Sequence, residues 1–360
     1  MINCEFWNGK RVFITGHTGF KGAWLCEILT SLCAKVYGYA LPAVSGGAYN
    51  MMDTDAKVNS TIDDIRDYEA LKPAFDTARP DIVFHLAAQP IVLDSYERPA
   101  YTFETNIQGT VNILECIRQT DCVKSAVIIT TDKVYRNNEW VYSYRESDTL
   151  GGGDPYSASK ACAELVTASY VASFFQNRGI AVSTTRSGNV IGGGDVAQNR
   201  IIPDCVRAAK TSEPIIVRNR HSVRPYQHVL EPLHAYMMIA ERQWENPVIA
   251  GSYNIGPNKE GCVTTGELVD LFCDTWSEID RGTQSETRSD AHWVDKSDPT
   301  APHESGLLTL DCSLIRSTFG WQPAWSITTA ITKTVEWEKA EDKKVVTRRQ
   351  IEEYLSVWQK

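Results

Sequence analysis

Short apolar runs alternate with amphipathic stretches through the first half of this chain. The runs are rich in Val, Ile and Phe and end in Gly, Asp, Asn or Thr, which is typical of buried strands followed by turns. The stretches between them repeat apolar residues at helical spacing. The pattern predicts strands at 11–15, 35–41, 81–87 and 125–131, and helices that end near 32, span 67–78 and lie near 100–120.

Strands that alternate with helices indicate a parallel sheet covered on both faces. We therefore expect an α/β fold, a Rossmann-type doubly wound parallel sheet with a smaller, mixed α/β C-terminal substrate lobe. Residues 1–185 are expected to form the dinucleotide-binding domain, with a return at 226–257, since 252–255 again has a strand pattern. The more irregular segments 186–225 and 258–360 are expected to form the substrate-binding lobe.

A glycine-rich turn joins the first predicted strand to the first predicted helix. Gly16, Gly19 and Gly22 have the spacing G-x-x-G-x-x-G, which in this context is typical of dinucleotide binding. Glycines let the backbone approach a pyrophosphate, and the helix N-terminus offers N–H groups and a partial positive charge. The candidate cofactor-binding residues of the turn are Gly16, Thr18, Gly19, Phe20, Lys21 and Gly22.

One common part of a dinucleotide site is missing. An acidic residue that binds the ribose usually follows the second strand, but positions 28–52 contain none. This position therefore leaves the choice between NAD and NADP open. Asp64 and Ile65 are candidates to flank the adenine. Further candidates beside the ribose and pyrophosphate, at the end of the next strand, are Ala87, Ala88 and Gln89.

Polar side chains follow the strand predicted at 125–131, which ends in Thr130, Thr131, Asp132 and Lys133. Further on, Tyr156 and Lys160 are four residues apart and share one face if they open a helix. A nearby cation favours the phenolate, so Tyr156 is expected to act as a base well below the usual phenol pKa of about 10. This combination suits oxidation of a sugar alcohol followed by acid–base chemistry beside the new ketone.

Composition narrows the class of protein. The chain has 360 residues with 42% hydrophobic and 22% charged residues, as expected of a soluble globular protein. A net charge of −9 argues against non-specific binding to nucleic acid or anionic membranes. We see neither a signal peptide nor a membrane span, and the ten cysteines contain no Cys-x-x-Cys pair. We expect reduced cysteines, no metal site and a cytoplasmic location.

With these motifs assembled, the chain resembles the extended short-chain dehydrogenase/reductase superfamily. Within it, the chain is similar to the nucleotide-sugar 4,6-dehydratases, and most similar to those acting on CDP-glucose. The resemblance runs almost end to end. It rests on the glycine turn and on segments 85–90, 144–146, 154–157, 188–195 and 224–233, and Asp132-Lys133 matches the CDP-glucose type.

The resemblance implies catalytic roles for Thr131, Asp132, Lys133, Tyr156 and Lys160 in NAD-dependent conversion of a nucleotide hexose to its 4-keto-6-deoxy form. Tyr156 would take the C4 hydroxyl proton, with Thr131 holding the C4 oxygen. Lys160 would lower the pKa of the phenol and hold the nicotinamide ribose, so Tyr156 and Lys160 also count as cofactor-binding residues. Lys133 would remove the C5 proton, and Asp132 would protonate the departing C6 hydroxyl.

By the same resemblance, the residues expected to bind the substrate are Asn106, Asn189, Arg218 and Arg224. His228 is expected to support the fold rather than the chemistry. The chain departs from the family at Leu93 and Asp94, where an arginine is replaced and an acid gained, and at Leu307, where an aromatic residue is missing. These departures leave the sugar and the base open.

Two other functions compete with the lyase. A nucleotide-sugar epimerase or reductase would use the same Tyr156 and Lys160, although neither route needs Asp132 and Lys133. A non-catalytic dinucleotide-binding protein would not need to keep Tyr156 and Lys160. The resemblance also implies a homodimer or homotetramer, with contacts through helices that include the one bearing Tyr156.

Overall fold

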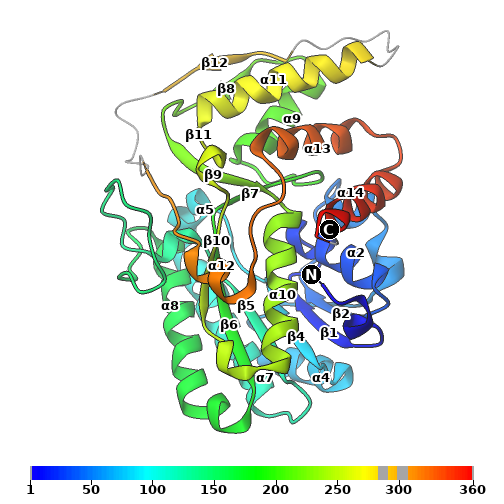
Figure 1. Cartoon of the computed structure of the whole chain (residues 1–360), viewed down its shortest axis with the longest axis vertical. Helices are drawn as coiled ribbons and strands as arrows, with labels where there is room; N and C mark the ends of the chain where they lie inside the picture. Colours follow the sequence, from blue (N-terminus) through cyan, green and yellow to red (C-terminus); the bar gives the residue numbers. More distant parts are fainter. Residues whose placement is uncertain (1, 283–290, 298–306, 359–360) are drawn as a thin grey trace.

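The computed structural model describes residues 2–282, 291–297 and 307–358. A seven-stranded parallel sheet forms its larger part, in the order β10-β6-β5-β4-β1-β2-β3 (Figure 1). The strands are β1 Arg11–Thr15, β2 Lys35–Ala40, β3 Asn59–Ile62, β4 Ile82–His85, β5 Ser125–Ile129, β6 Ala181–Ser187 and β10 Ser252–Ile255. The order reverses between β1 and β4, and crevices at such switch points hold ligands in doubly wound sheets.

Alternate residues of the central strands enter two separate cores, one on each face of the sheet. Val12 and Ile14 of β1 pack with the helices on one face, whereas Phe13 packs on the other. The first face is covered by α2 Phe20–Ser31 and α10 Leu230–Glu245, and the second by α4 Tyr68–Ala78, α7 Gly109–Arg118 and part of α8 Pro155–Tyr170. This arrangement confirms the doubly wound fold.

A third core belongs to a smaller group of elements beyond the carboxyl ends of the strands. Its residues come from α9 Ile201–Thr211, α11 Thr265–Gly282, α13 Ile327–Lys339 and short strands (Figure 1). The short strands are β7 Asn189–Ile191, β8 Ile215–Val217, β9 Val223–His228, β11 Cys262–Thr264 and β12 Trp293–Asp295. They form one sheet of order β11-β9-β7 and one pairing of β12 with β8.

The remaining helices are mostly short. The α-helices are α1 Cys4–Trp7, α3 Ala48–Met51, α5 Val92–Glu97, α6 Pro99–Phe103, α12 Ser313–Phe319 and α14 Lys343–Val357. The 3₁₀ and π turns are η1 Thr54–Lys57, η2 Glu104–Gln108, η3 Asp132–Val134, η4 Val171–Phe175, η5 Gln176–Arg178, η6 Pro247–Ile249 and η7 Lys259–Gly261.

The predicted boundary between domains does not follow every packing contact. Ile315 of α12 and Ile351 and Tyr354 of α14 join the core beside the main sheet, although both helices lie within 258–360. Within 226–257, β10 joins the main sheet and α10 covers one of its faces, whereas β9 pairs with β7 and β11. The division into 1–185 with a return, and 186–225 with 258–360, stays a prediction.

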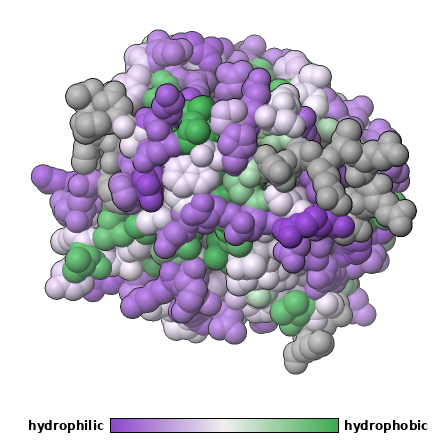
Figure 2. Space-filling model, turned by 90° about the horizontal axis from the view of Figure 1, so that it is seen from above, coloured by the Kyte–Doolittle hydropathy of each residue, from purple (hydrophilic) through white to green (hydrophobic). Residues whose placement is uncertain are grey.

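The surface seen in Figure 2 is mostly hydrophilic, with hydrophobic residues in small separate groups. Single apolar residues on a surface are normal in soluble proteins. Within residues 2–282, 291–297 and 307–358, no helix combines the length and the apolar character that a membrane crossing requires.

Candidate active site

The glycine turn lies at the switch point and fits tightly against the end of β4. Gly16 has φ of +76°, and a Cβ placed on it would lie 2.7 Å from the backbone nitrogen of Ala87. A Cβ on Gly22 would lie 2.2 Å from the carbonyl oxygen of Gly16. Only glycine fits at these two positions without moving the backbone.

The start of α2 is suited to an anion. Gly19 is its N-cap and supplies no side-chain acceptor to the first N–H groups of the helix. The Thr18 hydroxyl donates to the carbonyl oxygen of Leu41 at 2.8 Å, which ties the turn to the end of β2. The turn, the close approach to Ala87 and the helix N-terminus together fit the pyrophosphate of a dinucleotide.

The candidate adenine residues follow β3. The Asp64 carboxylate accepts hydrogen bonds from Arg66 Nε and Nη2, the latter at 2.7 Å, and these bonds lower the pKa of Asp64. Ile65 is buried against Gly109. The carboxylate of Asp64 is therefore fixed in place beside a buried apolar side chain, and its contact with adenine stays a prediction.

The Asn106 side chain is hydrogen-bonded to the Gln89 backbone and does not face open space. Asn106 Oδ1 accepts from the Gln89 backbone at 2.8 Å, and its Nδ2 donates to the Gln89 carbonyl and to Ser159 Oγ. The Gln89 amide bonds Ile91 and Thr102. Asn106 is 1% exposed within the π turn η2, so its visible role is to join the loop after β4 to α8. Its sugar contact stays a prediction.

Thr131, Asp132 and Lys133 come together at the end of β5. The Thr131 hydroxyl donates to Asp132 Oδ1 at 2.9 Å, and Lys133 Nζ lies 3.4 Å from the same oxygen. Asp132 is 1% exposed, and its Oδ2 has no hydrogen-bond partner among the described residues. A buried carboxylate oxygen without a partner is costly unless a ligand satisfies it, which favours a ligand-binding role.

Tyr156 and Lys160 lie in the first turns of α8, which begins at Pro155 with Asp154 as N-cap. Burial raises the pKa of Tyr156 to about 12, although the nearby Thr131 side chain works in the opposite direction. Lys160 Nζ donates to the carbonyl oxygen of Ile129 at 3.1 Å, and burial lowers the pKa of Lys160 to about 8. The phenol thus shares a site with Thr131, as predicted.

The direction of the Tyr156 pKa differs from the expectation. We expected Lys160 to hold it well below 10, but in the protein alone the ammonium points to Ile129 and desolvation of the phenolate dominates. The sequence shows the spacing of the two residues, but it does not show where the ammonium points.

Two further cations face this space. Burial lowers the pKa of Lys21 to about 7, and the charges of Arg200 and Lys160 act in the same direction. Arg200 caps α9 and pairs with Asp195 at 3.0 Å, and its charge also acts on Tyr156. The sequence reasoning missed Arg200, because an arginine in a loop is usually exposed and nothing in its spacing marks it.

The candidate substrate residues lie on β7, β9 and the loop before β9. Asn189 of β7 pairs with Tyr226 of β9. Arg224 is 6% exposed and donates to the Val223 carbonyl, whereas Arg218 is exposed and bonds Asn199. The departures at Leu93 and Asp94 lie in α5, which packs against α8. Leu307 forms an isolated β-bridge with Val223. The segment before it, 303–306, lies outside the described residues.

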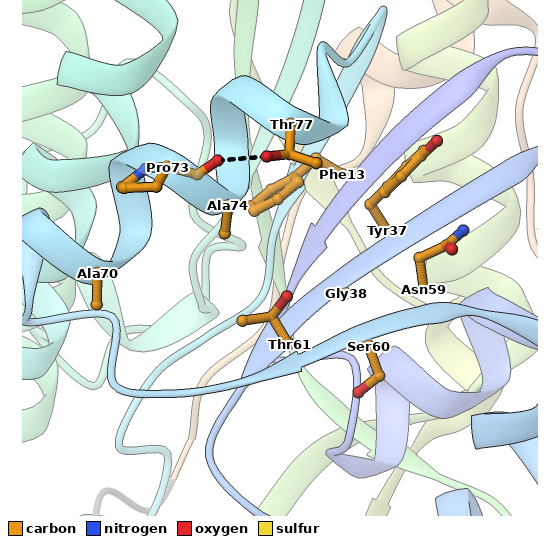
Figure 3. A pocket seen from close by; sticks show the side chains of 10 residues that line it. All are labelled: Phe13, Tyr37, Gly38, Asn59, Ser60, Thr61, Ala70, Pro73, Ala74 and Thr77. Carbon is orange, nitrogen blue, oxygen red and sulfur yellow. Dashed lines mark hydrogen bonds between the residues drawn. The ribbon is translucent and has the colours of Figure 1, made fainter.

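A cavity of about 530 Å³ lies at the opposite edge of the sheet, between α4 and strands β1–β3 (Figure 3). The Thr77 hydroxyl donates to the Pro73 carbonyl there (Figure 3). Ser60 bonds the His17 ring at 2.8 Å. The lining strand nearest to β5 is β1, two strands or about 10 Å away at normal strand spacing, and none of the candidate catalytic residues lines the cavity. This cavity is therefore separate from the candidate catalytic residues.

A family comparison agrees with this geometry, since the model of the GDP-mannose 4,6-dehydratase family matches residues 13–334. The chain belongs to this family. A CDP-glucose 4,6-dehydratase from Salmonella typhimurium is 42% identical over 367 residues, covering 99% of each chain. A dTDP-D-glucose 4,6-dehydratase from Mus musculus is 27% identical, covering 91% of this chain and 88% of the relative.

Solved structures of other proteins have the same fold as this chain. A dTDP-glucose 4,6-dehydratase from Streptomyces venezuelae with NAD and TYD bound has a TM-score of 0.75 at 24% identity, covering 91% of this chain and 96% of that one. A UDP-glucose 4-epimerase from Thermotoga maritima has a TM-score of 0.74 at 22% identity, covering 91% and 97%. Because dehydratases and epimerases share this fold, the fold does not decide between the reactions.

Proposed function

We propose that this protein is a hydro-lyase that carries out NAD-dependent 4,6-dehydration of CDP-glucose to CDP-4-keto-6-deoxyglucose. The observation that carries the proposal is Asp132 with Lys133 at the end of β5, beside Thr131, because this pair serves elimination and not simple oxidation. The 42% identity to a CDP-glucose 4,6-dehydratase over 99% of both chains supports it.

Tyr156 is the proposed base for the C4 hydroxyl. The Thr131 side chain lies near enough to lower the pKa of Tyr156, so one sugar oxygen is proposed to contact both hydroxyl groups. When bound, NAD supplies a hydride acceptor and donor. Lys160 is 5% exposed and has two free N–H groups beyond its bond to Ile129, which suits contact with a ribose.

Asp132 and Lys133 are the proposed acid and base of the elimination. Asp132 is buried, and its Oδ2, which has no hydrogen-bond partner among the described residues, is the atom proposed to face the departing hydroxyl. Lys133 is partly exposed at 29% of its side chain, so it can exchange protons with solvent. Their contact at 3.4 Å allows each group to respond to the charge of the other.

Basic residues are the proposed ligands of the substrate diphosphate. Arg224 offers a buried guanidinium and Arg218 an exposed one, and guanidinium binds phosphate bidentately. Asn189 on the adjacent strand is proposed to contact the sugar nucleotide. Arg200 faces Tyr156 from α9 and adds positive charge beside the reacting sugar. Leu93, Asp94 and Leu307 are the positions where base and sugar preference would differ from the family.

We propose NAD rather than NADP as the cofactor, held tightly and regenerated in each turnover. A 2′-phosphate would need a cation near the end of β2. Lys57 pairs with Glu27 at 2.7 Å and Arg66 pairs with Asp64 at 2.7 Å, so both nearby cations are already neutralised. The loops around them also carry Asp55 and Asp63, which disfavour a second phosphate.

A homodimer or homotetramer is proposed through α7 and α8, which pack against each other. Leu165 on α8 is 60% exposed and Phe174 beyond it is 43% exposed, and such apolar side chains suit a partner surface. Light scattering coupled to size exclusion would measure the mass. A monomer at micromolar concentration would contradict this assignment.

The test of function is incubation with CDP-glucose and a catalytic amount of NAD, followed by mass spectrometry. We expect a product lighter by one water. An epimerase would give an isomer of unchanged mass, and a reductase would consume NADH or NADPH in proportion to substrate. If CDP-glucose is unchanged, the same assay with dTDP-, GDP- and UDP-hexoses decides whether the base preference or the reaction is wrong.

A further inference from the structure

A buried ion pair lies directly beneath the candidate catalytic residues. Glu164 is one helical turn beyond Lys160 on α8, and Arg186 lies on β6. Arg186 donates to both carboxylate oxygens of Glu164, through Nε at 3.0 Å and Nη2 at 2.9 Å. The two side chains are only 4% and 3% exposed. A buried charge without its partner would destabilise the fold, so the two side chains are expected to stay paired.

The carboxylate also holds the end of β5. The Thr130 hydroxyl donates to Glu164 Oε1 at 2.5 Å, and the Thr184 hydroxyl donates to Oε2 at 2.6 Å. Thr130 immediately precedes Thr131, and Lys160 donates to the carbonyl of Ile129. Two successive residues of β5 are therefore attached to α8, one through Lys160 and one through Glu164.

The guanidinium extends the same network toward the substrate residues. Arg186 Nη1 donates to the Tyr135 hydroxyl at 2.9 Å and to the Glu146 carbonyl at 3.0 Å. The Tyr135 hydroxyl donates to Asn254 Oδ1 at 2.6 Å. Asn254 Nδ2 then donates to the carbonyls of Tyr144 and Asp311, four residues after Leu307. One arginine thus connects β6 with the strand β10 and the segment after position 307.

We propose that Glu164 and Arg186 are positioning residues that set Thr131, Asp132 and Lys133 in register with Tyr156 and Lys160. This inference rests on the dehydratase function proposed above. The pair acts on these residues indirectly. It acts through Thr130, which has its hydroxyl and its backbone N–H both fixed, the latter to the Thr185 carbonyl at 2.8 Å.

The directed hydrogen bonds that the carboxylate accepts explain why charged residues occupy this place. An apolar pair of the same volume would pack equally well and is often no less stable than a buried ion pair. It would remove the carboxylate that Thr130 and Thr184 share, leaving these hydroxyls only the Thr185 carbonyl at 3.1 Å and Ser252 Oγ at 2.9 Å, and the end of β5 would no longer be attached to α8 through Glu164. A misplacement of about 1 Å at a catalytic group lowers the rate by about 100-fold.

The carboxylate has an electrostatic effect on Lys160 as well. Burial lowers the pKa of Lys160 to about 8, and Glu164 acts in the opposite direction. The other charged or titratable groups around Lys160 are Lys21 on α2, His85 on β4, Arg186 on β6, and Asp132 and Lys133 on η3, which packs against α8. Glu164 raises the pKa of Lys160 against the effect of burial, so its carboxylate favours the ammonium form.

Three variants separate position from charge. Glu164→Gln removes the charge and one acceptor oxygen, and we expect kcat to fall by about 100-fold with KM changed less than about threefold. Glu164→Asp keeps the charge but is too short for both hydroxyls, so kcat should fall while the alkaline limb of the pH profile stays in place. Glu164→Leu combined with Arg186→Met should fold and bind NAD, yet remain slow.

A matched control exists on the opposite side of the sheet. Glu241 is also buried, at 4% exposure, and accepts from the Asn3 backbone and from Trp7 Nε1. Glu241→Gln should leave kcat unchanged. If it slowed turnover as much as Glu164→Gln, the effect would reflect general loss of a buried carboxylate, and the positioning role would be overturned.

A measurement without substrate keeps this inference separate from the proposed function. In protein with ¹³C-labelled lysine, the Lys160 resonance is identified by its absence in Lys160→Arg and then titrated by nuclear magnetic resonance. We expect Glu164→Gln to lower its midpoint, and Glu164→Asp and Glu241→Gln to leave it in place. An unchanged midpoint and a wild-type kcat in folded Glu164→Gln would overturn the proposal. A wild-type protein inactive on every nucleotide sugar, with the midpoint shift present, would overturn only the dehydratase function.

Discussion

Replacement of Gly16 by alanine tests whether the glycine turn holds the cofactor. Gly16 and Gly9 both have φ of +76°, but a Cβ on Gly9 would meet nothing within 4 Å, whereas one on Gly16 would lie 2.7 Å from Ala87 N. Both variants carry the backbone penalty of a left-handed alanine, about 1–2 kcal/mol of folding free energy. Gly9→Ala is therefore the control for that penalty, and only Gly16→Ala disturbs the contact with β4.

The effect on NAD affinity follows from this contact. A normal separation is about 3.5 Å, so the turn must move by about 0.8 Å. A hydrogen bond of about 2.9 Å from the turn to the pyrophosphate would lengthen beyond bonding distance. Its loss is worth about 1.5–3 kcal/mol for a charged acceptor, or about 10- to 150-fold in Kd.

Isothermal titration of cofactor-stripped protein with NAD measures this change. We expect Gly9→Ala to bind as the wild type does, and to unfold at a slightly lower temperature. Equal NAD affinity in Gly16→Ala and Gly9→Ala would refute the assignment of the turn as the pyrophosphate site, whatever the two melting temperatures.

Further predictions concern the chemistry, the cofactor and acid stability. Asp132→Asn and Lys133→Ala should each slow loss of water about 100-fold with NAD binding intact, and wild-type turnover in both would remove their roles. NADP should bind at least about 10-fold more weakly than NAD by titration, and equal affinity would contradict the charge argument. Urea midpoints should fall as pH drops from 6.5 to 5, and a flat profile would contradict burial of neutral imidazoles. Burial lowers the pKa of four histidines to about 4 or 3, namely His17, His85, His228 and His234.

The sign of the acid effect follows from the proton counts. A histidine with a lowered pKa stabilises the fold above about pH 6.5, and that stability is lost as pH falls. Glu231 acts in the opposite sense, because burial raises its pKa to about 7 and its contribution is lost as pH rises. Below pH 6.5 the unfolded chain thus binds at most about three more protons, which corresponds to a slope of about 4 kcal/mol per pH unit.

The sequence predicted β1, β2, β4, β5 and β10 of the main sheet but missed β3 and β6. β1, β2, β4 and β5 were visible because buried parallel strands are continuous apolar runs. β3 is Asn59–Ile62, at the edge of the sheet, and three of its four residues are exposed. Such a strand has no apolar pattern, and it forms because β2 offers its free edge. Edge strands of this kind depend on tertiary pairing and escape local reasoning.

The helix predicted near 100–120 is interrupted for a physical reason. It consists of α6, the π turn η2 and α7, and Asn106 within η2 bonds both Gln89 and Ser159. A π turn shifts the side chains that follow it, which periodicity alone cannot locate. The candidate catalytic residues were predictable because strand ends and helix starts carry local signals. Arg200 and the Glu164–Arg186 pair were not, because only the folded chain brings them to the site.

The two carboxylate oxygens of Asp132 have different surroundings. A buried carboxylate oxygen without a partner destabilises the fold. The structure limits this penalty to one oxygen, since Oδ1 is bound by Thr131 and approached by Lys133, while Oδ2 stays free. The unsatisfied atom is thus the one that remains available to a departing hydroxyl. Stability lost at Oδ2 would be recovered on substrate binding, so the same atom links ligand affinity to proton transfer.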